Sequence, residues 1–183
     1  GNALQSFVAL NAGKQSVPMD LRDPADLRQL KEMAAGADVL VDSLRPGVLD
    51  RHGLGAQALR EMNPGLVYCA ISGFGRQGPW ANRPAYDHVV QAATGMALMA
   101  GNEGDAPIKT GFPVVDAAAG MLAALAIVAA LRERDRTGRG RFIDVAMSAA
   151  AMQLMYTMSC DALTHGTVPA LVGNQGYSRS PAA

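Results

Sequence analysis

The sequence is poor in cysteine, histidine and aromatic residues, and it has no excess of charge of either sign. Its 183 residues include two cysteines, three histidines and 5% aromatic residues. Sixteen basic and sixteen acidic side chains cancel, so no overall field attracts nucleic acid or anionic lipid. A negatively charged ligand would have to be held by locally placed groups. The length and the apolar content of 49% are typical of one globular domain.

The residues that could bind metals or form disulfides are scattered. His52, His88 and His165 have no metal-ligand spacing, so no metal site is expected. Cys69 and Cys160 form no C-x-x-C motif, and we predict that both are buried free thiols in a reducing compartment. The first residues also lack an export signal. These features predict a cytoplasmic protein.

One long apolar run, 113–131, could be mistaken for a membrane span. It contains Asp116, and an aspartate at the centre of a span costs about 2.5–3.5 kcal/mol. Much of the run is alanine and glycine, which give only a weak driving force for insertion into lipid. A helix buried in a soluble core is the better interpretation, and no membrane partner is expected.

Helical patterns alternate with short Val, Ile and Leu runs along the chain. Strands are predicted over 7–10, 39–41, 66–71 and 142–145. Helices are predicted from an N-cap and proline at Asp23–Pro24, and over 46–52, 57–62, 86–99, 114–134 and 148–164, with a turn at 137–140. This alternation predicts an α/β fold in which a parallel sheet has helices on both faces. The last residues, 166–183, have the composition of a linker.

A glycine loop, SGFGRQGPW at 72–80, follows the predicted strand 66–71. Its glycines spell G-x-G-x-x-G at Gly73, Gly75 and Gly78. A dinucleotide site needs a helix to begin at the third glycine, and Pro79 and Pro84 prevent that here. The loop is therefore either a ligand-binding loop at the carboxyl end of a strand or a surface turn without a role.

Asp116 is an acidic residue at the start of an otherwise apolar helical segment. In the first turn of a helix, its charge is stabilised by the positive end of the helix dipole. The small residues that follow, 117–120, leave room for a bulky group to approach. Two interpretations remain open: a structural cap of the helix, or a carboxylate nucleophile for covalent catalysis.

Three arginines follow predicted strands or lie in loops: Arg22, Arg45 and Arg51. Arginine pairs with phosphate through two parallel hydrogen bonds. They could bind the phosphates of a nucleotide or be solvated surface residues.

Several motifs occur together in the order typical of one family. These are LNAGKQS at 10–16, MDLR at 19–22, ADVLV at 37–41, RPGVL at 45–49, the SGFGRQGP loop, YD at 86–87, Asp116 and TGRG at 137–140. In this combination the sequence resembles the family III CoA-transferases, the CaiB/BaiF-type superfamily that includes formyl-CoA transferases and α-methylacyl-CoA racemases. The resemblance implies a Rossmann-like parallel sheet flanked by helices. Residues 1–165 would be part of the large domain, and 166–183 the start of a linker toward a small domain. Because family members are longer, the chain resembles an internal fragment.

The resemblance also assigns the site. Asp116 matches the family's nucleophilic aspartate, and the three glycines would form an active-site loop that covers a thioester. The positions that match the family's CoA-binding residues are Met19, Asp20, Leu21, Arg22, Ser43, Leu44, Arg45, Arg51, Ala85, Tyr86 and Asp87. Coenzyme A would be part of the substrate, acyl-CoA, rather than a permanently bound cofactor. A free carboxylic acid would be the second substrate, and the full-length protein would be an interlocked homodimer.

The activity that this implies is acyl-CoA:carboxylate CoA transfer, through an aspartyl anhydride and an aspartyl-CoA thioester on Asp116. Two alternatives remain: a racemase or isomerase of the same superfamily, and a non-catalytic fragment that binds nucleotide or dimerises. Tyr86 stands where the racemases have a histidine base, and racemisation needs that base to exchange the α-proton. Transfer is therefore the favoured expectation.

Overall fold

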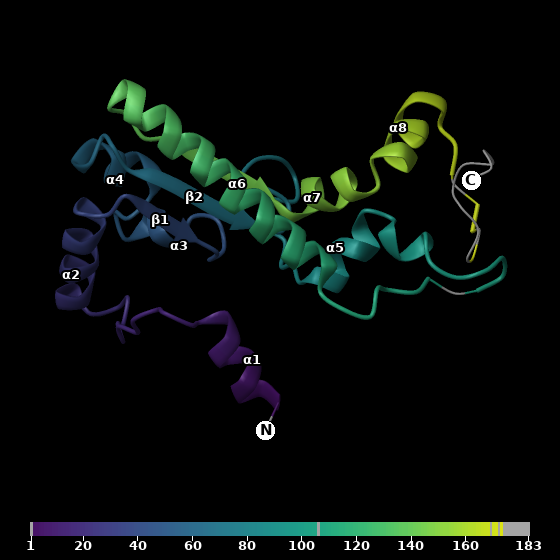
Figure 1. The fold of residues 1–183 in the computed structure, drawn as a ribbon, viewed down its shortest axis with the longest axis horizontal. Coiled ribbons are helices and arrows are strands. Elements are labelled where there is room, and N and C mark those ends of the chain that lie inside the picture. Colours follow the sequence, from purple (N-terminus) through teal and green to yellow (C-terminus); the bar gives the residue numbers. More distant parts are fainter. Residues whose placement is uncertain (1, 106, 169, 172, 174–183) are drawn as a thin grey trace.

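A computed structural model describes residues 2–105, 107–168, 170, 171 and 173 of the chain. Its centre is a parallel sheet of three strands in the order β1 (Val39–Asp42), β2 (Val67–Ser72) and β3 (Phe142–Ala146). Val39 pairs with Val67, and Tyr68 pairs with Phe142. Helices flank this sheet (Figure 1), so the predicted α/β class is confirmed.

The described helices are α1 (Asn2–Leu10), α2 (Pro24–Ala35), α3 (Val48–Arg51), α4 (Ala56–Met62), α5 (Asp87–Ala93), the 3-10 turn η1 (Met96–Leu98), α6 (Val114–Thr137), α7 (Met147–Leu154) and α8 (Tyr156–His165). The predicted cap of α2 is confirmed, because the Asp23 carboxylate accepts the Ala25 N–H at 2.7 Å. The predicted linker, 166–183, lies mostly outside the described residues.

Two apolar clusters lie on opposite faces of the sheet. Successive side chains of β2 point to opposite faces: Cys69 packs with Val115 of α6, and Tyr68 packs with Leu59 of α4. Residues 67–70 are all buried. The edge strand β1 is less buried than β2, since Val41 is 55% exposed. Only one neighbouring strand is paired with it in the part of the chain that is described.

The predicted strand at 7–10 is wrong, because these residues belong to helix α1. A short apolar run does not distinguish helix from strand, and no strand pairs with it among the described residues. The Asn11 side chain donates to the Phe7 carbonyl at 2.8 Å, which closes the helix. Phe7 and Val8 are 64% and 60% exposed, and Figure 1 shows α1 apart from the sheet.

Two predicted helices are each divided in the structure. The segment 86–99 contains α5 and then η1, because Gly95 takes a φ of 80° between them, which a continuing helix does not allow. The segment 148–164 is divided at Met155 into α7 and α8. The prediction that Cys160 is buried is also wrong: it lies on α8, which has no buried residue, and it is exposed.

Helix α6 is buried on one side only. Its inner face packs on β2, β3 and α7 through Val115, Ala118, Ala119, Ala123 and Ala130. On the outer face, Met121 and Leu125 are each 68% exposed. Of the helices described, α6 is the one long and apolar enough to cross a membrane by length and composition. The expectation of a buried core helix therefore holds for one face of α6, while the opposite face is exposed.

Candidate active site

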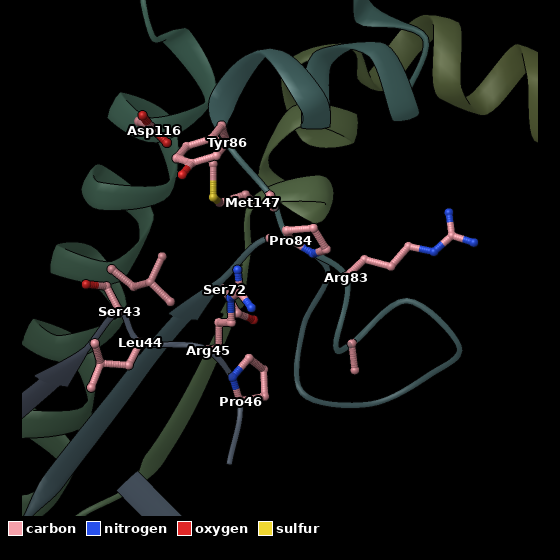
Figure 2. Close-up of a pocket in the computed structure, with 14 residues that line it drawn as sticks. Ser43, Leu44, Arg45, Pro46, Ser72, Arg83, Pro84, Tyr86, Asp116 and Met147 are labelled. Carbon is pink, nitrogen blue, oxygen red and sulfur yellow. The ribbon is translucent and has the colours of Figure 1, made fainter. Parts of the chain in front are cut away.

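The carboxyl ends of the three strands open onto one pocket of about 320 Å³. Segment 43–46 follows β1, Ser72 is the last residue of β2 and Gly73 follows it, and Met147 follows β3. All of these residues line the pocket (Figure 2). In parallel α/β sheets, ligands bind at this edge because the loops after the strands converge there. The topology therefore makes this pocket the candidate site.

Asp116 is part of the wall of this pocket. It is the third residue of α6, so the prediction that it lies in the first turn of a helix is confirmed. Figure 2 shows Asp116 and Tyr86 on one side of the pocket, with Arg45 and Pro46 on the other. The Asp116 side chain is open to solvent, and its carboxylate accepts no hydrogen bond from the described residues. Although the side chain is exposed, the surrounding protein removes part of its hydration. This desolvation, and then the negative charge of Asp87, raise the pKa of the Asp116 carboxyl.

About half of the residues predicted to bind CoA lie with Asp116 at the pocket. They are Ser43, Leu44, Arg45, Ala85 and Tyr86. The Tyr86 ring is stacked on His88, with 5.9 Å between ring centroids and 3° between planes. The loop after β1 and the segment before α5 are far apart in sequence, and the fold brings Arg45 and Tyr86 to opposite sides of one cavity (Figure 2).

The predicted segment 19–22 does not line the pocket. Arg22 pairs with Asp20 at 2.8 Å on the surface, and the hydrogen bonds from Arg22 lower the pKa of the Asp20 carboxyl. Leu21 packs against the apolar cluster that contains Leu59. Met19 and the exposed Arg51 of α3 also lie outside the lining. Their contact with CoA stays a prediction.

Asp87 is buried beside the pocket rather than on its wall. It is 9% exposed. One carboxylate oxygen accepts the N–H groups of Val115 and Asp116, at 2.8 and 3.0 Å. In this structure the carboxylate therefore holds the start of α6, and a contact between Asp87 and CoA stays a prediction.

The first residues of the glycine loop are held by contacts with neighbouring elements. Gly73 lines the pocket, and a methyl group added there would collide with the Ala85 side chain. Gly75 and Gly78, with φ of 82° and 95°, lie outside the lining. Between them, Arg76 donates a side-chain N–H to Asp50 at 2.5 Å and its backbone N–H to Asp144 at 3.0 Å. These bonds connect the loop to α3 and β3, and a covering role for the loop stays a prediction.

The sequence analysis missed seven pocket residues: Pro46, Ile71, Ser72, Ala81, Arg83, Pro84 and Met147. Ser72 and Met147 could have been found, because they stand at the ends of two predicted parallel strands. The Ser72 hydroxyl is buried and has no hydrogen-bond partner among the described residues. Arg83 had no local signal; its guanidinium lies 4.5 Å from the centre of the Trp80 ring and points away from Asp116 in Figure 2.

Within the described ranges, no group of three or more His, Cys, Asp or Glu side chains is placed to hold a metal ion. The charged groups on the pocket wall are Asp116, Arg45 and Arg83. This set combines one carboxylate with two cations, so it fits a ligand that has both an electrophilic centre and negative charge.

The sequence matches the model of CoA-transferase family III over residues 2–183. The chain belongs to this family. The acetyl-CoA:oxalate CoA-transferase of Acetobacter aceti is 39% identical over 177 residues, which are 96% of this chain and 45% of that protein. The succinyl-CoA:glutarate CoA-transferase of Mus musculus is 38% identical over 138 residues, 75% of this chain and 32% of that protein. The chain thus spans less than half the length of these relatives.

A solved structure supports the same fold. A CAIB/BAIF family protein from Brucella suis superposes with a TM-score of 0.84 at 34% sequence identity. The match covers 90% of this chain and 43% of that one. The predicted family III resemblance and its α/β fold are therefore confirmed.

Proposed function

We propose that the protein is an acyl-CoA:carboxylate CoA-transferase in which Asp116 is the covalent nucleophile. The observation that supports this most is the position of the Asp116 carboxylate. It lies without a hydrogen-bond donor among the described residues, on the wall of a pocket that also contains Arg45 and Tyr86. The relatives with CoA-transferase names add support for the reaction class.

The proposed reaction exchanges one activated acyl bond for another. The Asp116 carboxylate attacks the thioester carbonyl, the C–S bond breaks, and a mixed anhydride and CoA thiolate form. The thiolate then attacks the aspartyl carbonyl, which releases the donor carboxylate and leaves CoA as a thioester on Asp116. An acceptor carboxylate attacks this thioester, and the returning thiolate takes the acceptor acyl group and restores Asp116.

The residues around Asp116 suit this sequence of steps. Arg45 and Arg83 supply positive charge for the phosphates of CoA. Leu44, Ile71 and Met147 supply apolar wall for the uncharged arm of the substrate. Water has to be kept from the anhydride and the thioester. In this proposal the glycine loop, which lines the pocket at Gly73, contributes to that exclusion.

The racemase alternative has no base where the family resemblance requires one. Tyr86 occupies that position in place of the histidine. His88, two residues later, is not part of the pocket wall; its ring is stacked on Tyr86. We therefore favour transfer over proton exchange at the α-carbon.

A short dicarboxylic acid is proposed as one of the two acids. The named relatives act on oxalate, glutarate and succinyl-CoA. The proposal is tested with a panel of these acids and matched monocarboxylic acids. Preference for a monocarboxylic acid would contradict it.

Assembly is part of the proposal as well. The family resemblance implies an interlocked homodimer, and the exposed outer face of α6, with Met121 and Leu125 each 68% exposed, leaves apolar surface that such an assembly can cover. Sedimentation of the complete protein carrying this sequence tests this. A monomer at working concentration would contradict it.

The nucleophile is tested with Asp116→Asn in the complete protein carrying this sequence. Asparagine has nearly the same shape but cannot form the anhydride, so turnover should fall on the order of 10⁴-fold or more. CoA affinity, measured by calorimetry, should stay within about twofold, because the carboxylate reacts with the thioester and does not hold the nucleotide. Turnover that survives the substitution would contradict the assigned role.

A further inference from the structure

The start of α6 is capped by a residue from a distant part of the chain. Its N-cap residue, Pro113, makes no side-chain capping bond. Asp87, 28 residues before Val115, instead accepts the backbone N–H groups of Val115 and Asp116 with one oxygen, at 2.8 and 3.0 Å. These are two of the amides that have no partner within the helix.

Asp87 is itself held by a buried polar network. Its second carboxylate oxygen accepts a hydrogen bond from the Gln91 side-chain amide, and Gln91 is 1% exposed. The same amide donates to the Thr110 hydroxyl at 2.8 Å, while its oxygen accepts the Thr110 N–H at 2.9 Å. The hydroxyl donates onward to the Phe112 carbonyl at 2.8 Å. Each of these groups has a partner, so the network fixes the segment before α6 against α5.

The network has a direct consequence for Asp116. Free amides at a helix start stabilise a nearby anion, and a carboxylate in the first turn is often that anion. Here Asp87 occupies the amides of Val115 and Asp116, and the Asp116 carboxylate has no hydrogen-bond donor among the described residues. A carboxylate whose charge is not shared with donors is the stronger nucleophile.

We infer that Asp87, braced by Gln91 and Thr110, is a positioning residue for Asp116: it fixes the first turn of α6 and keeps that turn's amides away from the Asp116 carboxylate. The inference rests on the proposed function, because it concerns the reactivity of Asp116 as a nucleophile. Asp87 acts through the helix start and through Asp116 in this role.

The electrostatics agree with this geometry. Burial, and then the charge of Asp87, raise the pKa of Asp116. The other titratable or charged groups around the pocket are Arg45, Arg83 and Tyr86, with His88 stacked on Tyr86. Asp116 has to be ionised to attack, so its reaction rate falls as the pH falls through its pKa. Removing the charge of Asp87 should lower that pKa and move the acid limb of the rate profile to lower pH.

The test measures single-turnover formation of the Asp116 adduct, trapped with hydroxylamine, in the complete protein carrying this sequence. Thr110→Val removes the hydroxyl at constant shape and should slow adduct formation about tenfold or more, because small displacements of a nucleophile are costly. Thr110→Ser keeps the hydroxyl and should stay within about threefold of wild type. The KM for acyl-CoA should be unchanged within about twofold in both variants.

Asp87→Asn gives the second readout. This variant keeps an oxygen that can accept from the helix amides, and it removes the negative charge. The rate of adduct formation on the pH-independent plateau should fall. The acid limb of the pH–rate profile should move to lower pH. A purely structural role for Asp87 would leave the acid limb in place. If Asp87→Asn does not fold, the comparison of Thr110→Val with Thr110→Ser tests the inference.

The outcomes separate the two proposals. A wild-type protein that forms no adduct overturns the proposed function and this inference with it. A wild-type protein that forms the adduct, with variants that match it in rate and in pH dependence, overturns this inference alone.

Discussion

Two carboxylates lie at the start of α6, and the structure gives them different surroundings. Asp87 is buried and accepts hydrogen bonds from two helix amides and from Gln91. Asp116 is open to the pocket and accepts none within the described part of the chain. One carboxylate is therefore held as a structural anion, while the other is left available for chemistry.

The raised pKa of Asp116 has a consequence for stability. A carboxyl whose pKa is higher in the folded than in the unfolded state binds its proton more tightly when folded, so its ionisation destabilises the fold. Asp116→Asn should therefore be more stable than wild type at about pH 7, and the difference should shrink toward about pH 4. Urea unfolding at both pH values measures this. A difference that is the same at both, or larger in acid, would contradict it.

Sequence reasoning at the residue scale succeeded where the partners are local. The cap by Asp23 was predictable because it contacts an amide two residues later, at Ala25. The cap by Asp87 was not predictable, because its partners lie 28 and 29 residues away and only the fold brings them together. The position of Asp116 in a first helical turn was predictable, but the absence of donors around its carboxylate was not.

At the scale of elements, Arg76 connects the glycine loop to the sheet. Its side chain is 18% exposed and reaches Asp50 at 2.5 Å and Asp42 at 4.0 Å. The Tyr68 hydroxyl also donates to Asp42, at 3.0 Å. Burial and this neighbouring carboxylate raise the pKa of Tyr68, so the phenol stays protonated and continues to donate. The part of the glycine loop around Arg76 is thus part of the packed structure.

Removing the Arg76 side chain should loosen the attachment of the glycine loop to the sheet. Arg76→Ala leaves Asp42, 3% exposed, with fewer partners, and should cost about 1–3 kcal/mol of unfolding free energy. Hydrogen exchange over 73–80 should become faster. The matched control is Arg22→Ala, whose pair with Asp20 is exposed, so its loss should change the unfolding free energy much less than the loss of Arg76. Equal losses of unfolding free energy in the two variants, with unchanged hydrogen exchange over 73–80, would contradict this account.

The elements themselves were predicted unevenly. Three of the four predicted strands and most of the predicted helices are present, because the spacing of apolar residues and the turn residues are local signals. The segment 7–10 failed since a short apolar run fits helix or strand equally, and the decision depends on whether a neighbouring strand is available. The break at Met155 also had no local signal, with neither glycine nor proline at that position.

At the scale of the whole molecule, the centre of the sheet is the most protected part. Cys69 in β2 is fully buried, and that burial, with the nearby charge of Asp144, raises the pKa of its thiol. Cys160 on α8 is exposed. The two thiols therefore report on folding of the core and on the surface of α8 separately.

A thiol reagent such as DTNB should modify one cysteine of the native chain and both after unfolding in urea, because only a thiolate that meets the reagent reacts. Cys160→Ser is the matched control and should leave the native protein unreactive. Rapid modification of both cysteines in the native state would mean that β2 is not buried as described.

The pocket depends on the whole fold rather than on one motif. Segment 43–46, Gly73, Tyr86 and Asp116 come from separate elements, and the parallel order of the three strands brings them to one edge of the sheet. The family resemblance predicted several of these residues, but their convergence is a property of the topology. The position of Arg83 follows from the path of the loop between β2 and α5, which has no periodic pattern.

The account depends on covalent chemistry at Asp116, and peptide mapping tests that most directly. The complete protein carrying this sequence is incubated with acyl-CoA, treated with hydroxylamine, digested and sequenced by mass spectrometry. The account predicts a hydroxamate on Asp116, formed only with acyl-CoA and absent in Asp116→Asn. CoA transfer that proceeds while Asp116 stays unmodified, or a hydroxamate on another carboxylate, would contradict it.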